Sequence, residues 1–261
     1  MTASWPVALV TGASSGIGET FARHLARDGS DLVLVARRRS RLETIADELR
    51  HEHAVAVEVL DADLTDPDGV ERVARRLRDA TPPVDLLVNN AGFGSHGPFA
   101  DTDAAREADE VRLNVIAVQQ LAHAALAGMR ARRRGAILNV SSMAGFQPQP
   151  YAATYGATKA FVTSFSEALH AELAGSGVTV TALCPGFTRS DFAENAGVSE
   201  SVVPAPLWLS ADTVVDAGLR GLRRGRAVVV PGVGYQLTAA VSRVTPHAVT
   251  LPVVASVFRR R

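Results

Sequence analysis

The sequence of 261 residues is poor in cysteine, lysine, methionine and aromatic residues. The single cysteine, Cys184, excludes an intrachain disulfide framework and a zinc site built on cysteines. The 27 basic residues balance 27 acidic ones, which argues against a nucleic-acid binder because phosphate contacts need a basic excess. No apolar run reaches the ~18 residues of a membrane span, and the first residues lack the positive charge of a signal peptide. We therefore expect a soluble, cytoplasmic protein with no membrane span and no nucleic-acid partner.

What the chain does contain is a 47% share of hydrophobic residues, enough to form a core. Short apolar runs alternate with helical periodicity along the chain. Strands are expected at residues 7–10, 32–35, 54–60, 86–88, 136–140, 178–183 and 228–230, and helices at 17–28, 41–50, 66–79, 103–131 and 151–174. This alternation predicts an α/β fold, a doubly wound seven-stranded parallel sheet with helices on both faces. Since only turn signals separate the elements, we expect one domain over residues 1–261.

The first expected strand runs into the sequence T-G-A-S-S-G-I-G at residues 11–18. Glycines let a backbone approach a phosphate closely, and the amino end of a helix presents free N–H groups to an anion. The G-x-x-x-G-x-G spacing is neither the G-x-G-x-x-G dinucleotide pattern nor a P-loop. Its position between a strand and a helix nevertheless predicts a phosphate-binding loop, in preference to a turn without a ligand.

Three consecutive arginines follow the second expected strand, where an NAD-dependent enzyme has an acidic residue that accepts from the ribose 2′-OH. Arg37 lies close to where that acidic residue would fall. An arginine can pair with the 2′-phosphate of NADP. The sequence therefore predicts NADP(H) as the preferred cofactor, with NAD(H) as the alternative. Arg39 and Arg41 are expected to be solvated residues at the start of the second helix.

Lys159 is the only lysine of the chain and comes four residues after Tyr155. On a helix this spacing puts both side chains on one face. An adjacent ammonium is expected to lower the pKa of the phenol, so that Tyr155 can exchange a proton with a carbonyl oxygen. Tyr151 has no lysine at the same spacing and is interpreted as a wall of the pocket. Cys184 is interpreted as a small, packed apolar group.

These motifs resemble those of the short-chain dehydrogenase/reductase family, whose fold is of the Rossmann type. Further signatures follow in order: N-N-A-G at residues 89–92, Ser142, Y-x-x-x-K at 155–159 and P-G at 185–186. The resemblance covers residues 7–188 and implies the catalytic set Asn114, Ser142, Tyr155 and Lys159. Ser142, selected over Ser141 by its spacing to Tyr155, would hydrogen-bond the substrate carbonyl. Lys159 would bind the nicotinamide ribose, and Asn114 would help to hold a water that relays protons.

The loop, the arginine and the resemblance together define a set of expected cofactor-binding residues. These are Gly12, Ser14, Ser15, Gly16, Ile17, Gly18, Arg37, Asp63, Asn90, Ala91, Gly92, Tyr155, Lys159, Pro185, Gly186 and Thr188. The resemblance assigns Asp63 to the adenine ring, and a role as a turn residue is the alternative. No cluster of His, Asp or Glu has the spacing of metal ligands, so no metal is expected.

The resemblance implies an NADPH-dependent oxidoreductase that transfers hydride between nicotinamide and a carbonyl or secondary alcohol. Residues 187–206 are expected to form the substrate loop, whose apolar members favour an apolar ketone or a 3-oxoacyl-type substrate. Those members are Phe187, Phe192, Val198, Val202 and Val203. The alternative is a catalytically silent, dinucleotide-sensing binding protein. That alternative predicts the loss of a catalytic residue, whereas Ser142, Tyr155 and Lys159 are all present.

The tail, residues 232–261, is rich in apolar side chains that a soluble monomer would not leave bare. Three interpretations remain open: a lid over the substrate pocket, a subunit contact, or a helix lying on a membrane surface. Members of the family usually form homo-oligomers, so the resemblance implies a homodimer or a homotetramer.

Overall fold

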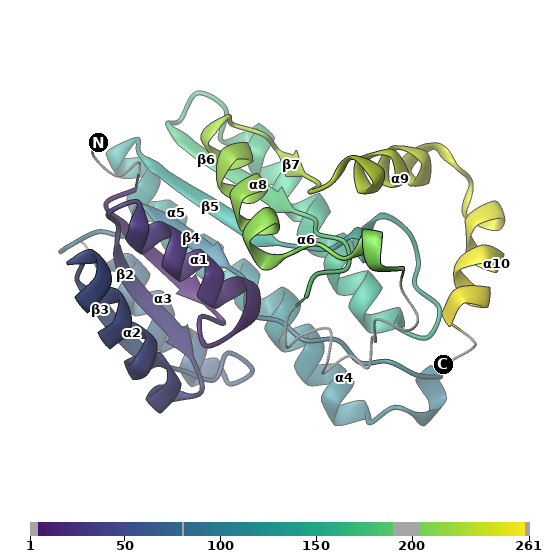
Figure 1. Cartoon of the computed structure of the whole chain (residues 1–261), viewed down its shortest axis with the longest axis horizontal. Coiled ribbons are helices and arrows are strands. Elements are labelled where there is room, and N and C mark those ends of the chain that lie inside the picture. Colours follow the sequence, from purple (N-terminus) through teal and green to yellow (C-terminus); the bar gives the residue numbers. More distant parts are fainter. Residues whose placement is uncertain (1–4, 80, 190–203, 259–261) are drawn as a thin grey trace.

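Seven parallel strands form one sheet in the computed structural model, which describes residues 5–79, 81–189 and 204–258. Their order across the sheet is β3-β2-β1-β4-β5-β6-β7 (Figure 1). The strands are β1 (Val7–Thr11), β2 (Asp31–Ala36), β3 (Val57–Asp61), β4 (Leu86–Asn89), β5 (Gly135–Val140), β6 (Val178–Leu183) and β7 (Val228–Val229). The predicted parallel sheet is confirmed.

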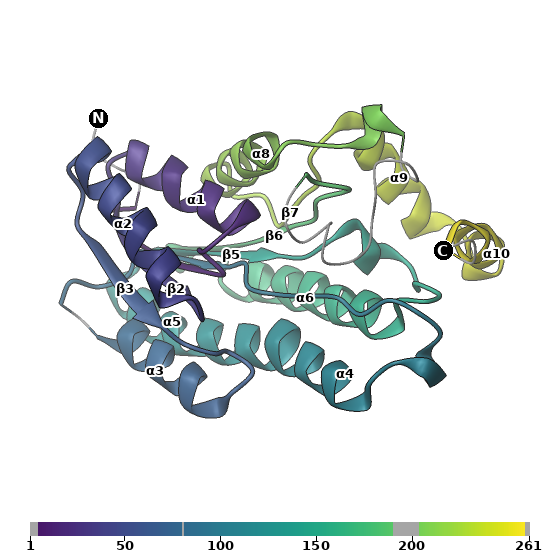
Figure 2. The same ribbon diagram turned by 60° about the horizontal axis from the view of Figure 1, so that its bottom comes forward.

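Helices pack on both faces of the sheet, with α1, α2 and α8 on one face and α3, α5 and α6 on the other (Figure 2). The described helices are α1 (Gly16–Arg27), α2 (Arg39–His53), α3 (Pro67–Arg78), α4 (Ala104–Val111), α5 (Val118–Arg132), α6 (Ala153–Glu172), α8 (Ala211–Arg223), α9 (Val233–Val244) and α10 (His247–Phe258). Short helical turns are η1 (Phe99–Asp101), η2 (Arg112–Ala117), η3 (Met143–Phe146) and η4 (Ala205–Leu207).

The strands β1, β2 and β4 in the middle of the sheet are mostly apolar because both of their faces are buried. Along β1, Val10 faces the core under α1, α2 and α8, and its neighbour Leu9 faces the core under α3 and α5. Both side chains are completely buried. This explains why the sequence shows continuous hydrophobic runs instead of the alternation typical of a half-exposed strand.

The chain leaves neighbouring strands β1 and β4 in opposite directions, so the crevice for a ligand lies at their carboxyl ends. Hydrogen bonds join these ends. Thr11 Oγ1 accepts from the backbone N–H groups of Asn90 and Ala91 at 2.9 and 3.0 Å. The Asn90 side chain donates back to the Thr11 carbonyl at 2.9 Å. The glycine loop after β1 is thereby fixed against the segment after β4.

Two helical regions differ from the prediction. The helix expected over residues 103–131 is divided into α4 and α5 by the π-helical turn η2. Helix α8 was not predicted, although Ser210 caps its amino end by accepting from the Thr213 N–H at 3.1 Å. Its buried face includes Val214 and Leu222 and covers the sheet beside α1. The helical periodicity there was a usable signal.

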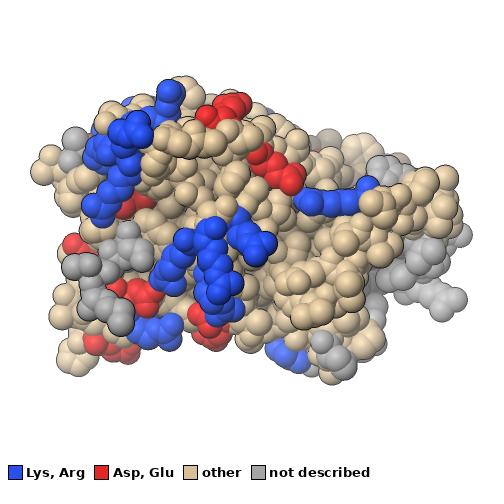
Figure 3. Space-filling view, turned by 90° about the horizontal axis from the view of Figure 1, so that it is seen from above, with Lys and Arg blue, Asp and Glu red and all other residues tan. Residues whose placement is uncertain are grey.

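Helices α9 and α10 extend from the end of the sheet beyond β7 (Figure 1). Arg243 anchors α9 to α6 and η3. It pairs with Glu167 of α6 at 3.0 Å and stacks over the ring of Phe146 in η3. The outer face of α9 is exposed and apolar, and Figure 3 shows that this end of the molecule carries few charged side chains. Its members are Val233, Leu237, Val241 and Val244. None of the described helices is long and apolar enough to cross a membrane.

Candidate active site

A cavity of about 820 Å³ opens at the carboxyl edge of the sheet, where β1 and β4 end. The catalytic candidates Ser142, Tyr155 and Lys159 line it, as do all the expected cofactor-binding residues except Gly18. Gly18 and Asn114 lie one layer behind the wall, against residues that form it. The site residues that the sequence predicted therefore gather in one place.

The glycine loop forms a tight cradle at one end of the cavity. A Cβ atom on Gly18 would lie 2.2 Å from the Gly12 carbonyl oxygen, so only glycine permits this approach of helix and loop. Residues Ser14 to Ile17 line the cavity at the amino end of α1. Ser15, the residue at the N-cap of α1, makes no capping hydrogen bond with its side chain within the described structure. The free N–H groups of this helix end fit a bound phosphate.

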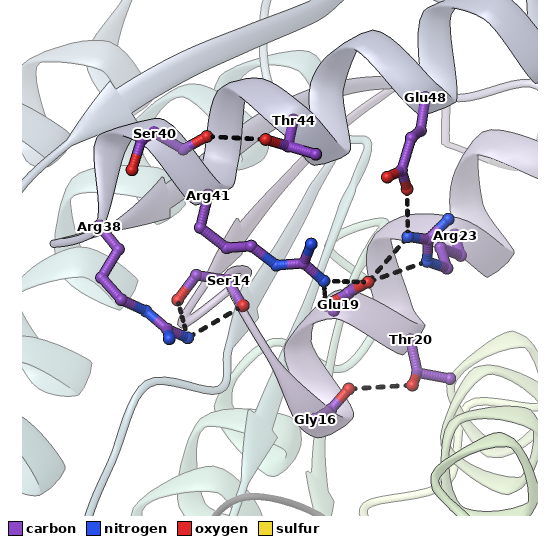
Figure 4. A network of polar contacts seen from close by, with 10 residues as sticks. All are labelled: Ser14, Gly16, Glu19, Thr20, Arg23, Arg38, Ser40, Arg41, Thr44 and Glu48. Carbon is purple, nitrogen blue, oxygen red and sulfur yellow. Dashed lines mark hydrogen bonds and ion pairs between the residues drawn. The ribbon is translucent and has the colours of Figure 1, made fainter.

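The arginines after β2 have different environments (Figure 4). Arg38 points toward the glycine loop and donates to the carbonyl and the hydroxyl of Ser14 at 3.1 and 3.2 Å. Arg37 is largely exposed, and its guanidinium lies 3.9 Å from the Asp63 carboxylate. Both arginines line the cavity. Arg38 was not predicted as a cofactor-binding residue, although its position in the arginine run was a signal.

The next two arginines pair with acids away from the cavity. Arg39 pairs with Glu43 and Asp61. Arg41 pairs with Glu19 of α1 (Figure 4). Neither side chain lines the cavity in the described structure. The interpretation of these two residues as solvated was incomplete, because both make ion pairs.

Asp63 lies at the cavity and also holds its own turn. One of its carboxylate oxygens accepts from the N–H and the hydroxyl of Thr65 at 2.9 and 2.7 Å. Partial burial acts to raise the pKa of Asp63, but the Thr65 hydrogen bonds and the Arg37 charge lower it overall. The carboxylate is thus stabilised as an anion at the edge of the cavity, and both roles considered for Asp63 fit its position.

Two adjacent serines follow β5 and point in different directions. Ser142 lines the cavity, accepts from the Ala144 N–H at 3.1 Å and hydrogen-bonds the hydroxyl of Tyr155. Ser141 is buried, and its hydroxyl donates to the Lys159 carbonyl at 2.8 Å. Strand alternation therefore directs Ser142 toward Tyr155, in agreement with the spacing argument.

Tyr155 and Lys159 lie on the cavity side of α6, one turn apart. The Lys159 ammonium lies 5.7 Å from the centre of the Tyr155 ring and donates to the Val140 carbonyl at 3.0 Å. Burial raises the pKa of Tyr155 to about 12, and the hydrogen bond from Ser142 opposes this only in part. Burial lowers the pKa of Lys159 to about 8. The prediction that Lys159 lowers the pKa of Tyr155 is wrong here, because desolvation of the phenolate dominates.

Asn114 lies in the π-helical turn η2 and is buried. Its amide donates to the Phe93 carbonyl at 2.8 Å and to the Thr158 hydroxyl at 3.1 Å, and its oxygen accepts from the Phe93 N–H at 3.2 Å. Gly94 follows Phe93 in the chain and packs closely on the Tyr155 ring. A Cβ atom on Gly94 would lie 2.9 Å from ring carbon Cδ2 of Tyr155. Asn114 thus fixes the loop that covers Tyr155.

Tyr235 of α9 closes the other end of the cavity, and no local pattern around it predicts this position. Its hydroxyl accepts from the Phe187 N–H at 3.1 Å and donates to the Leu207 carbonyl at 2.7 Å. A Cβ atom on Gly186 would lie 2.1 Å from Cζ of the Tyr235 ring. Thr238 and Ser242 of the same helix also line the cavity. The tail therefore contributes a wall of the pocket through one face of α9.

Several other predictions have different outcomes. Tyr151 does not line the main cavity in the described structure and lies instead at a separate cavity of about 20 Å³. Cys184 is fully buried, as expected, and burial raises the pKa of its thiol to about 11. Phe187 lines the cavity, whereas the other apolar members of the expected substrate loop lie outside the described residues. Within the described ranges, no group of three His, Cys, Asp or Glu residues could hold a metal.

Comparison with known proteins gives consistent matches. Residues 6–200 match the family model described as short chain dehydrogenase. A short-chain dehydrogenase from Sphingobium yanoikuyae, solved in complex with NADPH, is 41% identical, with 90% of this chain and 92% of that chain covered and a TM-score of 0.83. A bulky-bulky ketone specific alcohol dehydrogenase from Comamonas testosteroni is 38% identical, with 90% and 91% covered and a TM-score of 0.79.

Among curated proteins, a very-long-chain 3-oxoacyl-CoA reductase from Laccaria bicolor is 37% identical over 201 residues. That match covers 76% of this chain and 59% of the relative. The chain therefore spans about 60% of the length of this and of other curated relatives.

Proposed function

Because the chain belongs to the short-chain dehydrogenase/reductase family and is an NAD(P)-dependent oxidoreductase, we propose that it interconverts ketones and secondary alcohols with NADP(H). The proposal rests on the arrangement of the catalytic and cofactor-binding candidates along one cavity. Ser142, Tyr155 and Lys159 lie on its wall, and the glycine cradle with Arg37 and Arg38 forms its far end.

The residues at the cradle end fit a dinucleotide. The helix amino end beside the cradle suits a phosphate, because its N–H groups are available and residues Ser14 to Ile17 line the cavity there. Arg37 and Arg38 would hold the 2′-phosphate, and Asp63 would contact the adenine ring. The remaining cofactor contacts would come from Asn90, Ala91, Gly92, Pro185, Gly186 and Thr188. When bound, the nicotinamide supplies hydride for reduction and accepts it in alcohol oxidation.

The chain's own residues handle the proton. In reduction Tyr155 donates its phenolic proton to the carbonyl oxygen, and in oxidation the phenolate takes the proton of the alcohol. The Ser142 hydroxyl hydrogen-bonds the same oxygen and stabilises the charge that develops there. The Lys159 ammonium lies 5.7 Å from the centre of the Tyr155 ring and would bind the nicotinamide ribose. Asn114 keeps residues 93 and 94 packed on Tyr155 and would hold a relay water near Lys159.

The substrate class is a bulky apolar ketone or a 3-oxoacyl compound. Phe93, Phe187 and Tyr235 supply aromatic walls at the substrate end of the cavity. These aromatic side chains make the substrate end of the cavity suitable for an apolar compound. A relative specific for bulky-bulky ketones and another that reduces 3-oxoacyl-CoA support this assignment.

The test is a panel of aryl and alkyl ketones, 3-oxoacyl-CoA thioesters and the matching alcohols, followed by nicotinamide absorbance. Tyr155→Phe is expected to lower kcat by at least ~10² while NADPH affinity stays unchanged. Tyr151→Phe is the matched control, because Tyr151 lies at a different cavity, and it should retain turnover. Near-native turnover of Tyr155→Phe would contradict the mechanism. NADPH binding without turnover of any compound would favour the dinucleotide-sensing alternative.

Three further expectations remain proposals. We expect residues 1–261 to form one domain, with 187–206 as the substrate loop, in a soluble cytoplasmic protein. We also expect a homodimer or a homotetramer, and the exposed outer face of α9 is a suitable surface for a subunit contact.

A further inference from the structure

Glu110 of α4 is a buried acid that the reaction described above does not use. It is 0% exposed. Its Oε2 accepts from the Ser95 N–H at 2.8 Å, whereas its Oε1 has no hydrogen-bond partner among the described protein atoms. Burial raises the pKa of Glu110, and the hydroxyl and N–H of Ser95, which both face this carboxyl, oppose that rise. A buried carboxyl with a free oxygen is costly, so its retention calls for a reason.

The position of Glu110 relates it to the catalytic helix. Helix α4 packs against α6. Four residues after Glu110, Asn114 bonds Thr158 of α6, so this face of the α4–η2 helix is directed at α6. Thr158 is the neighbour of Lys159 in the chain. Glu110 thus lies on the face that meets the helix carrying Tyr155 and Lys159.

Lys159 is a buried cation that lacks an ion pair in the described structure. Its ammonium donates to one carbonyl, that of Val140. A buried charge is stable only when an opposite charge or several hydrogen bonds compensate it. The titratable groups around Glu110 are Glu107 on its own helix and Tyr155 and Lys159 on α6. The Glu110 charge raises the pKa of Lys159 against the effect of burial, and it also raises that of Tyr155.

We propose that Glu110 is a positioning residue that holds Lys159 as an ammonium and Tyr155 as a phenol, the two protonation states that reduce a carbonyl. Its carboxylate acts through space on both groups of α6. Removal of the charge lets Lys159 and Tyr155 release their protons at lower pH, because both lose the same stabilisation of the protonated form. Glu110 therefore biases the resting protein toward carbonyl reduction. The catalytic consequence rests on the proposed function, whereas the effect on Lys159 does not.

The first experiment reads Lys159 directly, without any substrate. Because Lys159 is the only lysine, a protein labelled with nitrogen-15 at lysine Nζ gives one side-chain signal. In Glu110→Gln this signal should titrate about one pH unit lower than in the wild type. The glutamine oxygen can still accept from the Ser95 N–H. Glu110→Met, which removes the charge at similar volume, gives a second route if the glutamine variant does not fold. Equal titration of the wild type and the charge-free variant would overturn the proposal.

The second experiment is the pH profile of kcat in both directions. In Glu110→Gln the alkaline loss of reductase activity and the rise of alcohol oxidation should both move to lower pH, by about one unit. Glu107→Gln is the matched control, because Glu107 is a buried acid on the same helix but does not act on Lys159. It should leave both profiles and the lysine signal in place. Unmoved profiles in Glu110→Gln would overturn the proposal. A shifted lysine signal with no turnover of any substrate would instead contradict the proposed function alone.

Discussion

The two ends of the cavity are built in different ways. At the cofactor end the glycine loop packs backbone against backbone, since a Cβ on Gly18 would meet the Gly12 carbonyl. The side chains of Thr11 and Asn90 join this loop to the segment after β4. At the substrate end one side chain, Tyr235, joins Phe187 to Leu207. A backbone cradle tolerates no added atom, whereas a wall made of side chains can change by substitution. We infer that substrate choice can vary in this fold while the dinucleotide site stays constant.

We expect the two ends of the cavity to differ most in their response to substitution of a closely packed glycine by alanine. In Gly18→Ala the new Cβ would meet the Gly12 carbonyl at 2.2 Å, and this backbone cannot move aside. We expect destabilisation by about 3 kcal/mol or more and loss of NADPH binding. In Gly186→Ala the Cβ would meet the Tyr235 ring, a side chain, so the added substitution Tyr235→Ala should relieve this clash.

Thermal unfolding and NADPH titration measure these effects. Gly234→Ala is the control, because among the described residues nothing beyond its own turn of helix lies within 4 Å of its Cβ position. If Gly18→Ala bound NADPH as the wild type does, the cradle would not depend on close backbone approach.

The contrast also explains what the sequence could predict. Ser142, Tyr155 and Lys159 belong to strand ends and a helix turn, so local spacing brings them together. Tyr235 reaches Phe187 across 48 positions of the chain, and no local pattern encodes that contact. Glu110 has the appearance of a surface acid in the sequence, yet tertiary packing buries it.

Two errors have the same origin. The pKa of Tyr155 was predicted to fall because Lys159 is nearby in sequence, and burial, which spacing does not reveal, raises it to about 12. Tyr151 is interpreted from the sequence as a pocket wall because it has no lysine at the spacing that Tyr155 has. Helix α6 begins at Ala153, so Tyr151 precedes the helix and does not share its cavity face. The local sequence pattern identified the side chains of this region, but it did not show which of them tertiary packing buries or which cavity each one faces.

A moderate effect is expected at the arginines of the cofactor end. Arg37→Ala and Arg38→Ala should each weaken NADPH binding by about tenfold, since each removes a charged partner of the 2′-phosphate, and NADH binding should hardly change. Arg39→Ala is the control, because Arg39 is engaged by Glu43 and Asp61. Dissociation constants from quenching of tryptophan fluorescence would measure this. An unaltered protein that binds NADH as tightly as NADPH would refute the assignment of both arginines.

The smallest effect is expected at the substrate end. Tyr235→Phe removes only the hydroxyl, which hydrogen-bonds the Phe187 N–H and the Leu207 carbonyl. Each neutral hydrogen bond contributes about 1 kcal/mol, but water can replace part of this interaction at a half-buried side chain. We therefore expect KM for the ketone to rise about fivefold, with kcat and NADPH affinity unchanged. Thr238→Val is the control, because the Thr238 hydroxyl lines the same cavity but bonds only the Gly234 carbonyl within α9. Steady-state kinetics at saturating NADPH separate the outcomes. A fall in kcat or NADPH affinity instead of a rise in KM would mean that Tyr235 supports the whole cavity, and the two ends would then not be independent.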